Sequence, residues 1–336
     1  MIITVSSSSH KYDILLQRGG LGKAGEQFNL ARKVLIVTDS GVPREYADRV
    51  AAQCLAPTVE VIPQGEQSKC FDTYKHLLGV LVQQAFTRTD CVVAVGGGVV
   101  GDLAGFVAAS YMRGIDFYNV PTTVLSQVDS SIGGKVAIDF EGYKNIVGAF
   151  WPPKGVIIDP DVLATLPARQ ISNGLAESVK MALTSDADLF RIFERGEALD
   201  NIDTVIERSL LIKRAVVEQD EREGGLRRIL NFGHTVGHAV ESQFGLSRYY
   251  HGECVAIGML PMCSEEVRAR LMPVLRSLSL PTEAGCDAEQ LAEDMRHDKK
   301  MSGDSINAVF VPSVGSYEIR SMPLEQLAAL IKEAQI

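Results

Sequence analysis

The sequence predicts an α/β fold, with an N-terminal Rossmann-like domain built on a parallel sheet and a mainly α-helical domain after it. Three observations support this prediction. Short apolar runs alternate with helical stretches in the first half, and one of these runs leads directly into a glycine-rich turn. After about residue 160, strand-like runs nearly vanish and helical periodicity takes over.

The predicted strands of the first half are continuous apolar runs. Such strands, when helices separate them, are typical of a parallel sheet covered on both faces. Ligands of these sheets bind beyond the C-terminal ends of the strands. The predicted strands span Lys33–Asp39, 91–95, 117–121 and 156–159.

The second half shows a spacing of apolar residues that is typical of helices. A late strand is expected at 306–311, and we place the domain boundary near 151–159, which gives domains 1–158 and 159–336. The predicted helices span 170–183, 202–217, 235–244 and 253–271.

Composition narrows the function. The formal net charge of −9 argues against a nucleic-acid-binding protein, because such proteins need an excess of Lys and Arg. No apolar run is long enough to span a membrane, and residues 1–5 indicate a strand rather than a signal peptide. Six cysteines without a C-x-x-C pair are expected to be free thiols in the cytoplasm.

The glycine-rich turn at 96–102 fits the pattern G-x-G-x-x-G between a strand and a helix. Glycines let the backbone approach a pyrophosphate, and the helix N-terminus favours an anion. The match alone is weak, because a tight strand-to-helix turn is the other interpretation. The motif also follows an inner strand, and no acidic residue closes a strand about 20 residues later. Asp39 does end an earlier strand and can accept hydrogen bonds from a ribose.

Two further segments follow predicted strands. Thr122 and Thr123 either contact a cofactor or cap the next helix. The segment 64–69 either begins a helix or contacts a nucleotide. Spacing alone leaves both pairs of alternatives open.

Histidines gather in the second half, where His234, His238 and His251 are three of only six in the chain. His234 and His238 are four residues apart and share a helix face, a spacing that can bind zinc. The metalloprotease motif needs Glu after the first His, and Thr235 stands there instead. The cluster favours a site that is not a protease.

Charged residues also lie in unusual surroundings. Glu177 and Lys180 sit among small and apolar residues of a predicted helix, which favours a metal ligand or a buried ion pair. Lys135 follows two glycines, Lys213 lies in the predicted helix 202–217, and Arg227 precedes Asn231 by one helical turn. Such cations in an acidic chain indicate an anionic small molecule that carries phosphate or carboxylate groups.

Together these segments resemble the 3-dehydroquinate synthases, a family of sugar-phosphate cyclases. The resemblance spans most of the chain in family order. The segments that carry it are 96–106, 111–114, 120–123, 127–135, 144–145, 231–234 and 251–253.

The resemblance implies an enzyme that uses NAD and a divalent metal ion, which is zinc or alternatively cobalt. It also implies a homodimer. The implied metal ligands are Glu177, His234 and His251, which moves His238 from the metal to the substrate phosphate. The other residues implied at the phosphate are Lys135, Asn145, Lys299 or Lys300, and Arg113 from a neighbouring subunit.

Further positions are implied for the acid end of the substrate and for the cofactor. Asp129 and Lys144 are implied near both cofactor and substrate. The residues implied at the carboxylate and hydroxyls are Lys180, Lys213, Arg227 and Asn231. The residues implied at NAD are Asp39, Glu66, Lys69, Gly97, Gly98, Asp102, Thr122, Thr123, Lys144, Thr165 and Leu166.

Two positions depart from the family pattern. Gly41 stands where the family often has Asn, so a ribose contact is missing or replaced, and segment 136–143 differs from the commoner version. The implied substrate is 3-deoxy-D-arabino-heptulosonate 7-phosphate, a phosphorylated sugar acid that becomes 3-dehydroquinate. The alternatives are another cyclase (an aminodehydroquinate, inosose or valiolone synthase), a metal-dependent polyol dehydrogenase, and a binding protein without catalysis.

Overall fold

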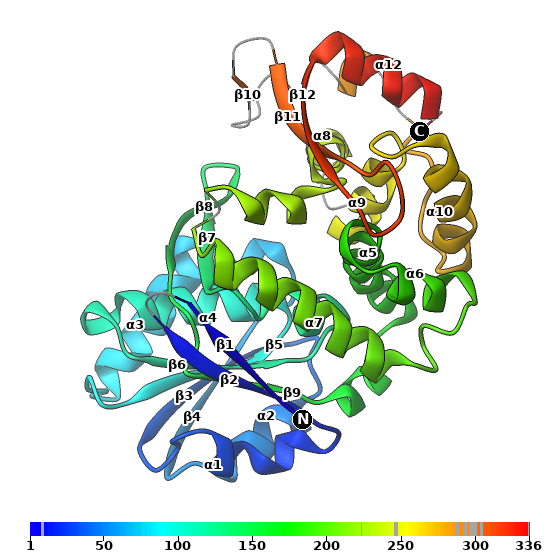
Figure 1. Cartoon of the computed structure of the whole chain (residues 1–336). Coiled ribbons are helices and arrows are strands. Elements are labelled where there is room, and N and C mark those ends of the chain that lie inside the picture. The colour runs from blue at the N-terminus through cyan, green and yellow to red at the C-terminus, as the bar shows by residue number, and fades with distance from the viewer. Residues whose placement is uncertain are drawn as a thin grey trace. The chain divides into compact units, whose positions relative to one another are not determined.

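A computed structural model gives the structure of the chain for residues 1–7, 10–222, 224–244, 248–285, 289–291, 295, 301–302, 305–334 and 336 (Figure 1). These residues divide into two compact units, Met1–Leu166 and Pro167–Ile336. The division falls later than the boundary expected at 158/159. The reason is the short helix η5 (Pro160–Thr165), whose Val162 lies in a core cluster of the first unit.

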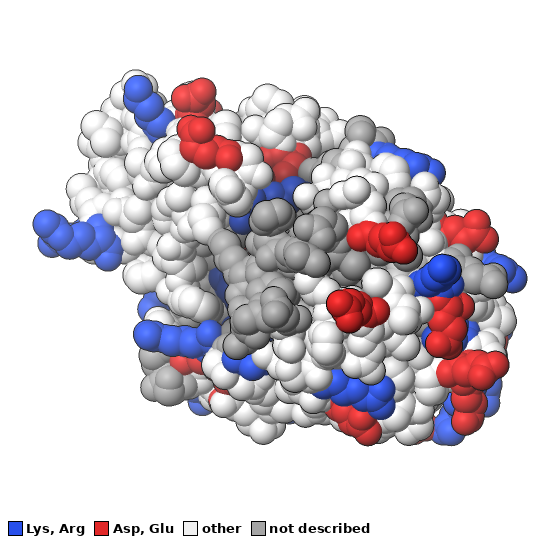
Figure 2. All heavy atoms as spheres, turned by 90° about the horizontal axis from the view of Figure 1, so that it is seen from above, with Lys and Arg blue, Asp and Glu red and all other residues white. Residues whose placement is uncertain are grey.

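Charged side chains of both signs lie on the face drawn in Figure 2. On this face, acidic and basic side chains are interspersed rather than gathered by sign. Within the described ranges, no helix has the length and apolar character needed to cross a membrane.

The first unit is built on a seven-stranded sheet in the order β1-β2-β9-β6-β5-β3-β4. Its strands pair in parallel, except that β1 and β2 are antiparallel. The chain runs from β3 outward to β4 and then returns to the other side of β3 with β5. This reversal is a topological switch point, where ligands of such sheets bind. The strands are β1 (Ile2–Ser6), β2 (Lys11–Leu16), β3 (Lys33–Asp39), β4 (Ala56–Ile62), β5 (Cys91–Gly96), β6 (Asp116–Pro121) and β9 (Gly155–Ile158).

Both faces of this sheet are covered. Alternate residues of a strand point to opposite faces. Ile36 of β3 packs in a cluster with Tyr46 and Val50 of α2, whereas Leu35 packs with Leu77 of α3. The apolar run of β3 therefore reflects burial on two sides. The helices and hairpin of this unit are η1 (Gly20–Lys23), α1 (Ala24–Gln27), α2 (Arg44–Ala51), η2 (Glu66–Ser68), α3 (Phe71–Gln83), α4 (Gly98–Ser110), η3 (Tyr111–Arg113), η4 (Ser126–Ser130), β7 (Lys135–Phe140) and β8 (Tyr143–Phe150).

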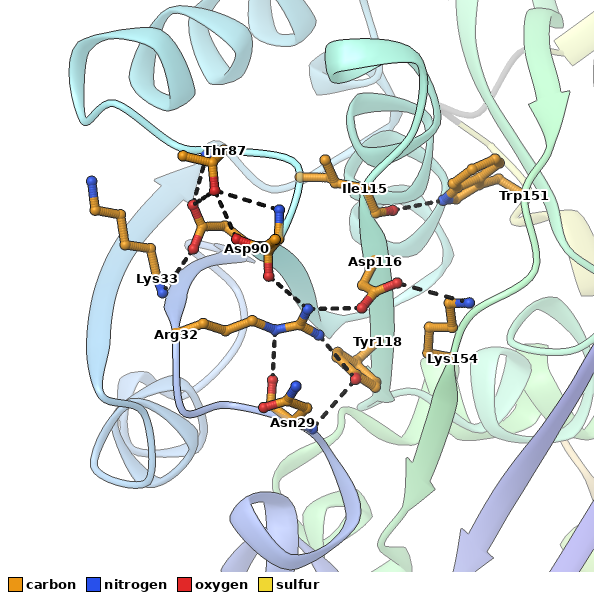
Figure 3. A network of polar contacts seen from close by, with 11 residues as sticks. Asn29, Arg32, Lys33, Thr87, Asp90, Ile115, Asp116, Tyr118, Trp151 and Lys154 are labelled. Carbon is orange, nitrogen blue, oxygen red and sulfur yellow. Dashed lines mark hydrogen bonds and ion pairs between the residues drawn. The ribbon is translucent and has the colours of Figure 1, made fainter.

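A polar network around Arg32 ties together the amino ends of the central strands (Figure 3). The Arg32 guanidinium donates to Asp116 Oδ2 at 2.7 Å, to Tyr118 Oη at 3.1 Å and to the Asn29 carbonyl at 2.8 Å. Asp90 accepts the backbone N–H of the first residue of β3. These bonds connect the amino ends of the strands, and the glycine turn lies at the opposite, carboxyl end. They therefore stabilise the fold and take no part in ligand binding.

The second unit is mainly helical. The helix predicted over 253–271 is wrong as a single element, because the chain forms two helices with a break between them. Pro261 lies in this break, and the Ser264 hydroxyl caps the second helix by accepting the Val267 N–H. The helices are α5 (Ala168–Ser185), α6 (Ala187–Glu194), α7 (Ile202–Gln219), η6 (Leu226–Asn231), α8 (His234–Phe244), α9 (His251–Met259), α10 (Glu265–Ser277) and α12 (Leu324–Ala334).

A small antiparallel sheet completes the second unit. Its strands are β10 (Met301–Ser302), β11 (Ser305–Phe310) and β12 (Glu318–Pro323). The late strand predicted at 306–311 corresponds to β11 within one residue at each end.

Candidate metal centre and cofactor site

Three side chains of the second unit converge on one point. Glu177 comes from the middle of α5, His234 from the first turn of α8, and His251 from the first turn of α9. The Nε2 atoms of both histidines lie 3.6 Å from Glu177 Oε1. One ligand atom from each residue lies within 4.8 Å of the others, so the three can share a metal ion.

Glycines allow α8 and α9 to approach each other this closely. A Cβ atom placed on Gly258 of α9 would lie 2.0 Å from the Gly233 carbonyl oxygen. A Cβ atom on Gly237 of α8 would lie 2.8 Å from the Cys254 carbonyl oxygen. Backbone therefore meets backbone where the helices cross, and their histidines reach the same point.

The Glu177 carboxylate is held in its charged form, as a metal ligand must be. Burial alone would raise the pKa of Glu177, but Lys180 and His251 lower it to about 2, so the carboxylate is ionised. The Lys180 ammonium contacts Oε2. Oε1 is buried and accepts no hydrogen bond from the described residues.

The two imidazoles differ in protonation. Burial and the nearby Lys180 ammonium push the pKa of His234 well below its usual value. Its Nδ1 lies 3.1 Å from the Phe232 carbonyl oxygen, which can only accept, so Nδ1 carries the proton and Nε2 presents a lone pair. Burial disfavours the charged form of His251, but Glu177 and Glu241 raise its pKa to about 9.

This arrangement passes a test of fit for a metal ion. The His234 lone pair and the Glu177 oxygen are two electron-pair donors that face one another at 3.6 Å, and a cation between them would relieve their repulsion. Two nitrogen ligands and one carboxylate also form a known donor set of catalytic zinc sites, which keep one position open.

His238 lies beside this group rather than inside it. It is exposed on α8, and its ring centroid is 5.3 Å from that of His234. His238 also forms a second possible ligand group with Glu241 and His251. The structure thus brings together both the pair suggested by spacing and the triad implied by resemblance.

Buried cations adjoin the triad. Lys180 is 2% exposed, Arg227 3% and Lys213 5%, and they come from α5, η6 and α7, which pack on one another. Asp220 organises the approach to Arg227, because its carboxylate accepts the backbone N–H groups of Gly224, Gly225 and Arg227 at 2.7–2.9 Å. Burial opposes the Asp220 charge, but these N–H groups lower its pKa.

In the first unit, the glycine turn at 96–98 joins β5 to α4 at the switch point of the sheet. No side chain caps the N-terminus of α4, so its N–H groups are available to an anion. A Cβ atom on Gly97 would lie 3.1 Å from Thr123, and one on Gly98 would lie 3.3 Å from Ser130. This cradle fits a pyrophosphate. Thr123 also accepts the Ser126 N–H, which is the capping role that spacing had left open.

Lys69 is the centre of a second polar cluster near this turn. Its buried ammonium lies 2.7 Å from Glu66 Oε1, 2.7 Å from Asn145 Oδ1 and 3.3 Å from Asp102 Oδ2. Burial raises the pKa of Asp102 to about 6, although Lys69 acts in the opposite direction. The cluster holds residue 145 of the β7–β8 hairpin against the first turns of α4.

A family model described as "3-dehydroquinate synthase N-terminal" matches residues 59–173, and one described as "3-dehydroquinate synthase C-terminal" matches residues 174–301. A curated 3-dehydroquinate synthase of Streptococcus suis (strain 05ZYH33) is 39% identical over an alignment 354 positions long, which covers 99% of this chain and 100% of the relative. The chain belongs to the 3-dehydroquinate synthase family.

Solved structures of related cyclases share this fold. One is ValA, a 2-epi-5-epi-valiolone synthase from Streptomyces hygroscopicus subsp. jinggangensis 5008 with NAD+ and Zn2+ bound. It is 27% identical, with a TM-score of 0.88 over 98% of each chain. A 2-deoxy-scyllo-inosose synthase complexed with carbaglucose-6-phosphate, NAD+ and Co2+ is 24% identical. Its TM-score of 0.86 over 99% of each chain shows the same fold.

The 3-dehydroquinate synthase resemblance implied several further positions, and the structure places them in different settings. Asp39 ends β3 and accepts the Gly41 N–H at 2.7 Å. Thr165 accepts or donates a hydrogen bond with Tyr46 at 3.0 Å, and Leu166 is half-buried. Thr122 begins the segment after β6, where its N–H donates to the Gly96 carbonyl.

The remaining positions implied by this family lie mostly on exposed elements. Lys135 and Lys144 are exposed on the β7–β8 hairpin, Asp129 is half-buried in η4, and Arg113 is exposed at the end of η3. Lys135, Asp102 and Gly98 line one small cavity of the first unit. Lys299 and Lys300 lie outside the described residues.

Several residues that contact the site residues were not predicted from the sequence. Glu241 lies 3.5 Å from His251 Nδ1, and Asn173 accepts the N–H of the residue after His251. Asp139 accepts the Asn145 N–H at 2.8 Å. The spacing of Asn173 four residues before Glu177 is a signal that was available, whereas the hairpin contact of Asp139 depends on a register that no local pattern reveals.

Proposed function

We propose that the chain converts 3-deoxy-D-arabino-heptulosonate 7-phosphate into 3-dehydroquinate and phosphate, using NAD and a divalent metal ion. The near-complete coverage of a 39% identical 3-dehydroquinate synthase supports this proposal. One observation of the structure carries it. A buried, ionised Glu177 faces two imidazole nitrogens at 3.6 Å, next to the buried ammonium of Lys180.

Glu177, His234 and His251 would hold the metal ion, with zinc or cobalt as candidates. Metal ions of both kinds occur with NAD+ in the related cyclase structures. When bound, such an ion supplies Lewis-acid stabilisation of negative charge on a substrate oxygen. The chain contributes a charged carboxylate, a His234 ring already in the correct tautomer, and the exclusion of water around Glu177.

The cofactor would lie at the carboxyl ends of β3, β5 and β6. NAD supplies the acceptor and later the donor of a hydride. The N–H groups at the start of α4 would bind its pyrophosphate, and Asp39 would accept hydrogen bonds from a ribose. Asp39 is 9% exposed and burial raises its pKa, so hydrogen bonds donated by the ribose hydroxyls would stabilise its charged form.

The substrate carries a carboxylate and a phosphate, and the chain offers separate cations for them. Lys180, Lys213 and Arg227 are buried in the second unit and would hold the carboxylate, because desolvated cations bind anions more strongly than solvated ones. Lys135, Asn145 and His238 would bind the phosphate, as Arg113 of a neighbouring subunit in a homodimer would. These groups fix the orientation in which the C5 hydroxyl reacts.

The overall conversion comprises transient oxidation at C5, elimination of phosphate, re-reduction, ring opening and an intramolecular aldol closure. Oxidation acidifies the neighbouring C–H, and the substrate phosphate can itself take that proton. The chain then needs no dedicated general base, and its part is to position the substrate and stabilise charge.

Incubating the protein with the heptulosonate phosphate, catalytic NAD and zinc tests this function. We expect phosphate and 3-dehydroquinate to form in equal amounts, without net NADH. Accumulating NADH would indicate a polyol dehydrogenase instead. A lack of turnover, together with activity on a neutral sugar phosphate, would indicate an inosose or valiolone synthase. The buried cation set Lys180, Lys213 and Arg227 favours the acid substrate.

A further inference from the structure

The first turn of α9, which carries His251, is held by three residues of α5. Arg169, Asn173 and Glu177 are each four residues apart, so they lie on one face of α5. They face three consecutive residues at the start of α9. Arg169 binds Glu253, Asn173 binds Gly252, and Glu177 faces His251.

The outermost of the three contacts is a bidentate ion pair between Arg169 and Glu253. Arg169 Nε donates to Glu253 Oε1 at 2.7 Å, and its Nη2 donates to Oε2 at 2.8 Å. Oε2 also accepts the backbone N–H of Tyr250, the residue that caps α9, at 2.7 Å. The guanidinium lies 4.3 Å from the centre of the Tyr250 ring. The Glu253 side chain is only 7% exposed, so its charge is compensated by these donors.

The middle contact fixes the backbone next to His251. Asn173 Oδ1 accepts the Gly252 N–H at 2.6 Å in a buried setting. A Cβ atom on Gly252 would lie 1.9 Å from the Asn173 carbonyl oxygen, so α5 and α9 touch through their backbones here. These contacts of Gly252 therefore fix the backbone of His251 relative to α5, even without a bound ligand.

The ring of His251 has a support of its own. Glu241 of α8 lies 3.5 Å from His251 Nδ1, which leaves Nε2 toward Glu177. Backbone and ring are thus fixed by different elements, and neither Arg169 nor Glu253 belongs to the possible ligand groups of the described residues.

We propose that Arg169 and Glu253 are positioning residues that, with Asn173, hold His251 in place for the metal ion, and so raise the affinity of the centre. This inference rests on the metal site of the proposed function. A ligand that is fixed in advance loses less freedom when the ion binds. Partners outside the ligand set commonly change metal affinity about 10- to 100-fold when they are removed.

Arg169→Ala is the first test, because the Arg169 side chain is 52% exposed and its removal leaves no large cavity. Zinc affinity would be measured by competition with a chelator, and the visible spectrum of the Co2+-loaded protein would report ligand geometry. We expect zinc to bind about 10- to 100-fold more weakly, with an altered Co2+ spectrum. Glu253→Gln is the second variant, in case Arg169→Ala does not fold.

Arg270→Ala is the matched control. Arg270 also forms a bidentate ion pair, with Glu194, at 2.8 and 3.0 Å, and its side chain is 40% exposed. This pair joins α10 to α6, so it does not contact the metal ligands. We expect this variant to lose similar stability and keep the zinc affinity and Co2+ spectrum of the wild type. Unchanged zinc affinity in both Arg169→Ala and Glu253→Gln would overturn the positioning role, as would an equal loss in Arg270→Ala. A wild-type chain that binds neither ion would overturn the metal centre itself.

Discussion

Replacing Gly258 with Ala tests whether the close crossing of α8 and α9 builds the metal centre. The new Cβ atom would lie 2.0 Å from the Gly233 carbonyl oxygen and 2.6 Å from the Gly237 nitrogen. Ordinary contact needs roughly 3.4 Å, so the helices must separate by about 1.4 Å. Metal–ligand distances tolerate only about 0.2 Å, and His234 and His251 lie on the two helices that move apart.

The energetic balance of Gly258→Ala is also calculable. Alanine favours a helix over glycine by about 1 kcal/mol, whereas overpacking costs about 1–3 kcal/mol. We therefore expect a net loss of about 0–2 kcal/mol in the free energy of unfolding, and a much larger loss of zinc affinity. Denaturant titration measures the first quantity and chelator competition the second.

Gly79→Ala is the control for this prediction. Gly79 lies in α3, and no atom lies within 4 Å of a Cβ placed there. We expect this variant to be slightly stabilised and to bind zinc normally. A Gly258→Ala protein with wild-type zinc affinity and activity would refute the claim that the backbone crossing sets the centre.

Three other variants probe the two units. Asp102→Asn removes a carboxyl whose pKa of about 6 lies above the ordinary value of 3.8. The folded wild type binds that proton more tightly, so between about pH 4 and 7 it should lose about 1–3 kcal/mol of stability relative to the variant. Lys69→Met leaves Glu66 and Asp102 without their shared cation, and we expect a loss of about 3–5 kcal/mol in unfolding free energy and weaker NAD binding by calorimetry. Asp220→Ala frees the backbone before Arg227, and we expect a higher KM for the acid substrate, with zinc affinity unchanged.

Each of these has a contradicting result. Parallel pH profiles of wild type and Asp102→Asn would show that the carboxyl titrates normally. A Lys69→Met protein of unchanged stability would mean that the surrounding carboxylates are well solvated. An unaltered KM in Asp220→Ala would show that Arg227 keeps its place without the three N–H bonds.

Local patterns predicted the parts of the fold that are buried on two sides. The run Lys33–Asp39 is continuously apolar from Val34 to Val37, and β3 has the bounds that were predicted for it. β4 was missed, because it is a half-exposed edge strand that contains Pro57 and carries no continuous apolar signal. The hairpin β7–β8 was not predicted either, because most of its second strand is exposed and lacks an apolar pattern.

Local sequence patterns also predicted only part of the metal site. Histidine spacing alone pointed to His234 with His238. The apolar surroundings of Glu177 favoured either a metal ligand or a buried ion pair, and only the resemblance joined Glu177 to His234, which lies 57 positions later in the sequence. Spacing describes one helix, whereas the triad joins α5, α8 and α9. The contacts of Arg169 and Asn173 depend on how two helices meet, so no single segment contained them.

The bonds around Arg32 have a consequence for how such a scaffold diversifies. They join the amino ends of β3, β5 and β6, whereas Asp39 and the glycine turn at 96–98 lie at the carboxyl ends of the strands. Residues at the carboxyl ends of the strands can therefore change without breaking the hydrogen bonds that connect the amino ends. Substitutions meant to raise thermal stability can therefore be placed among the residues that bond to Arg32, away from the proposed cofactor site.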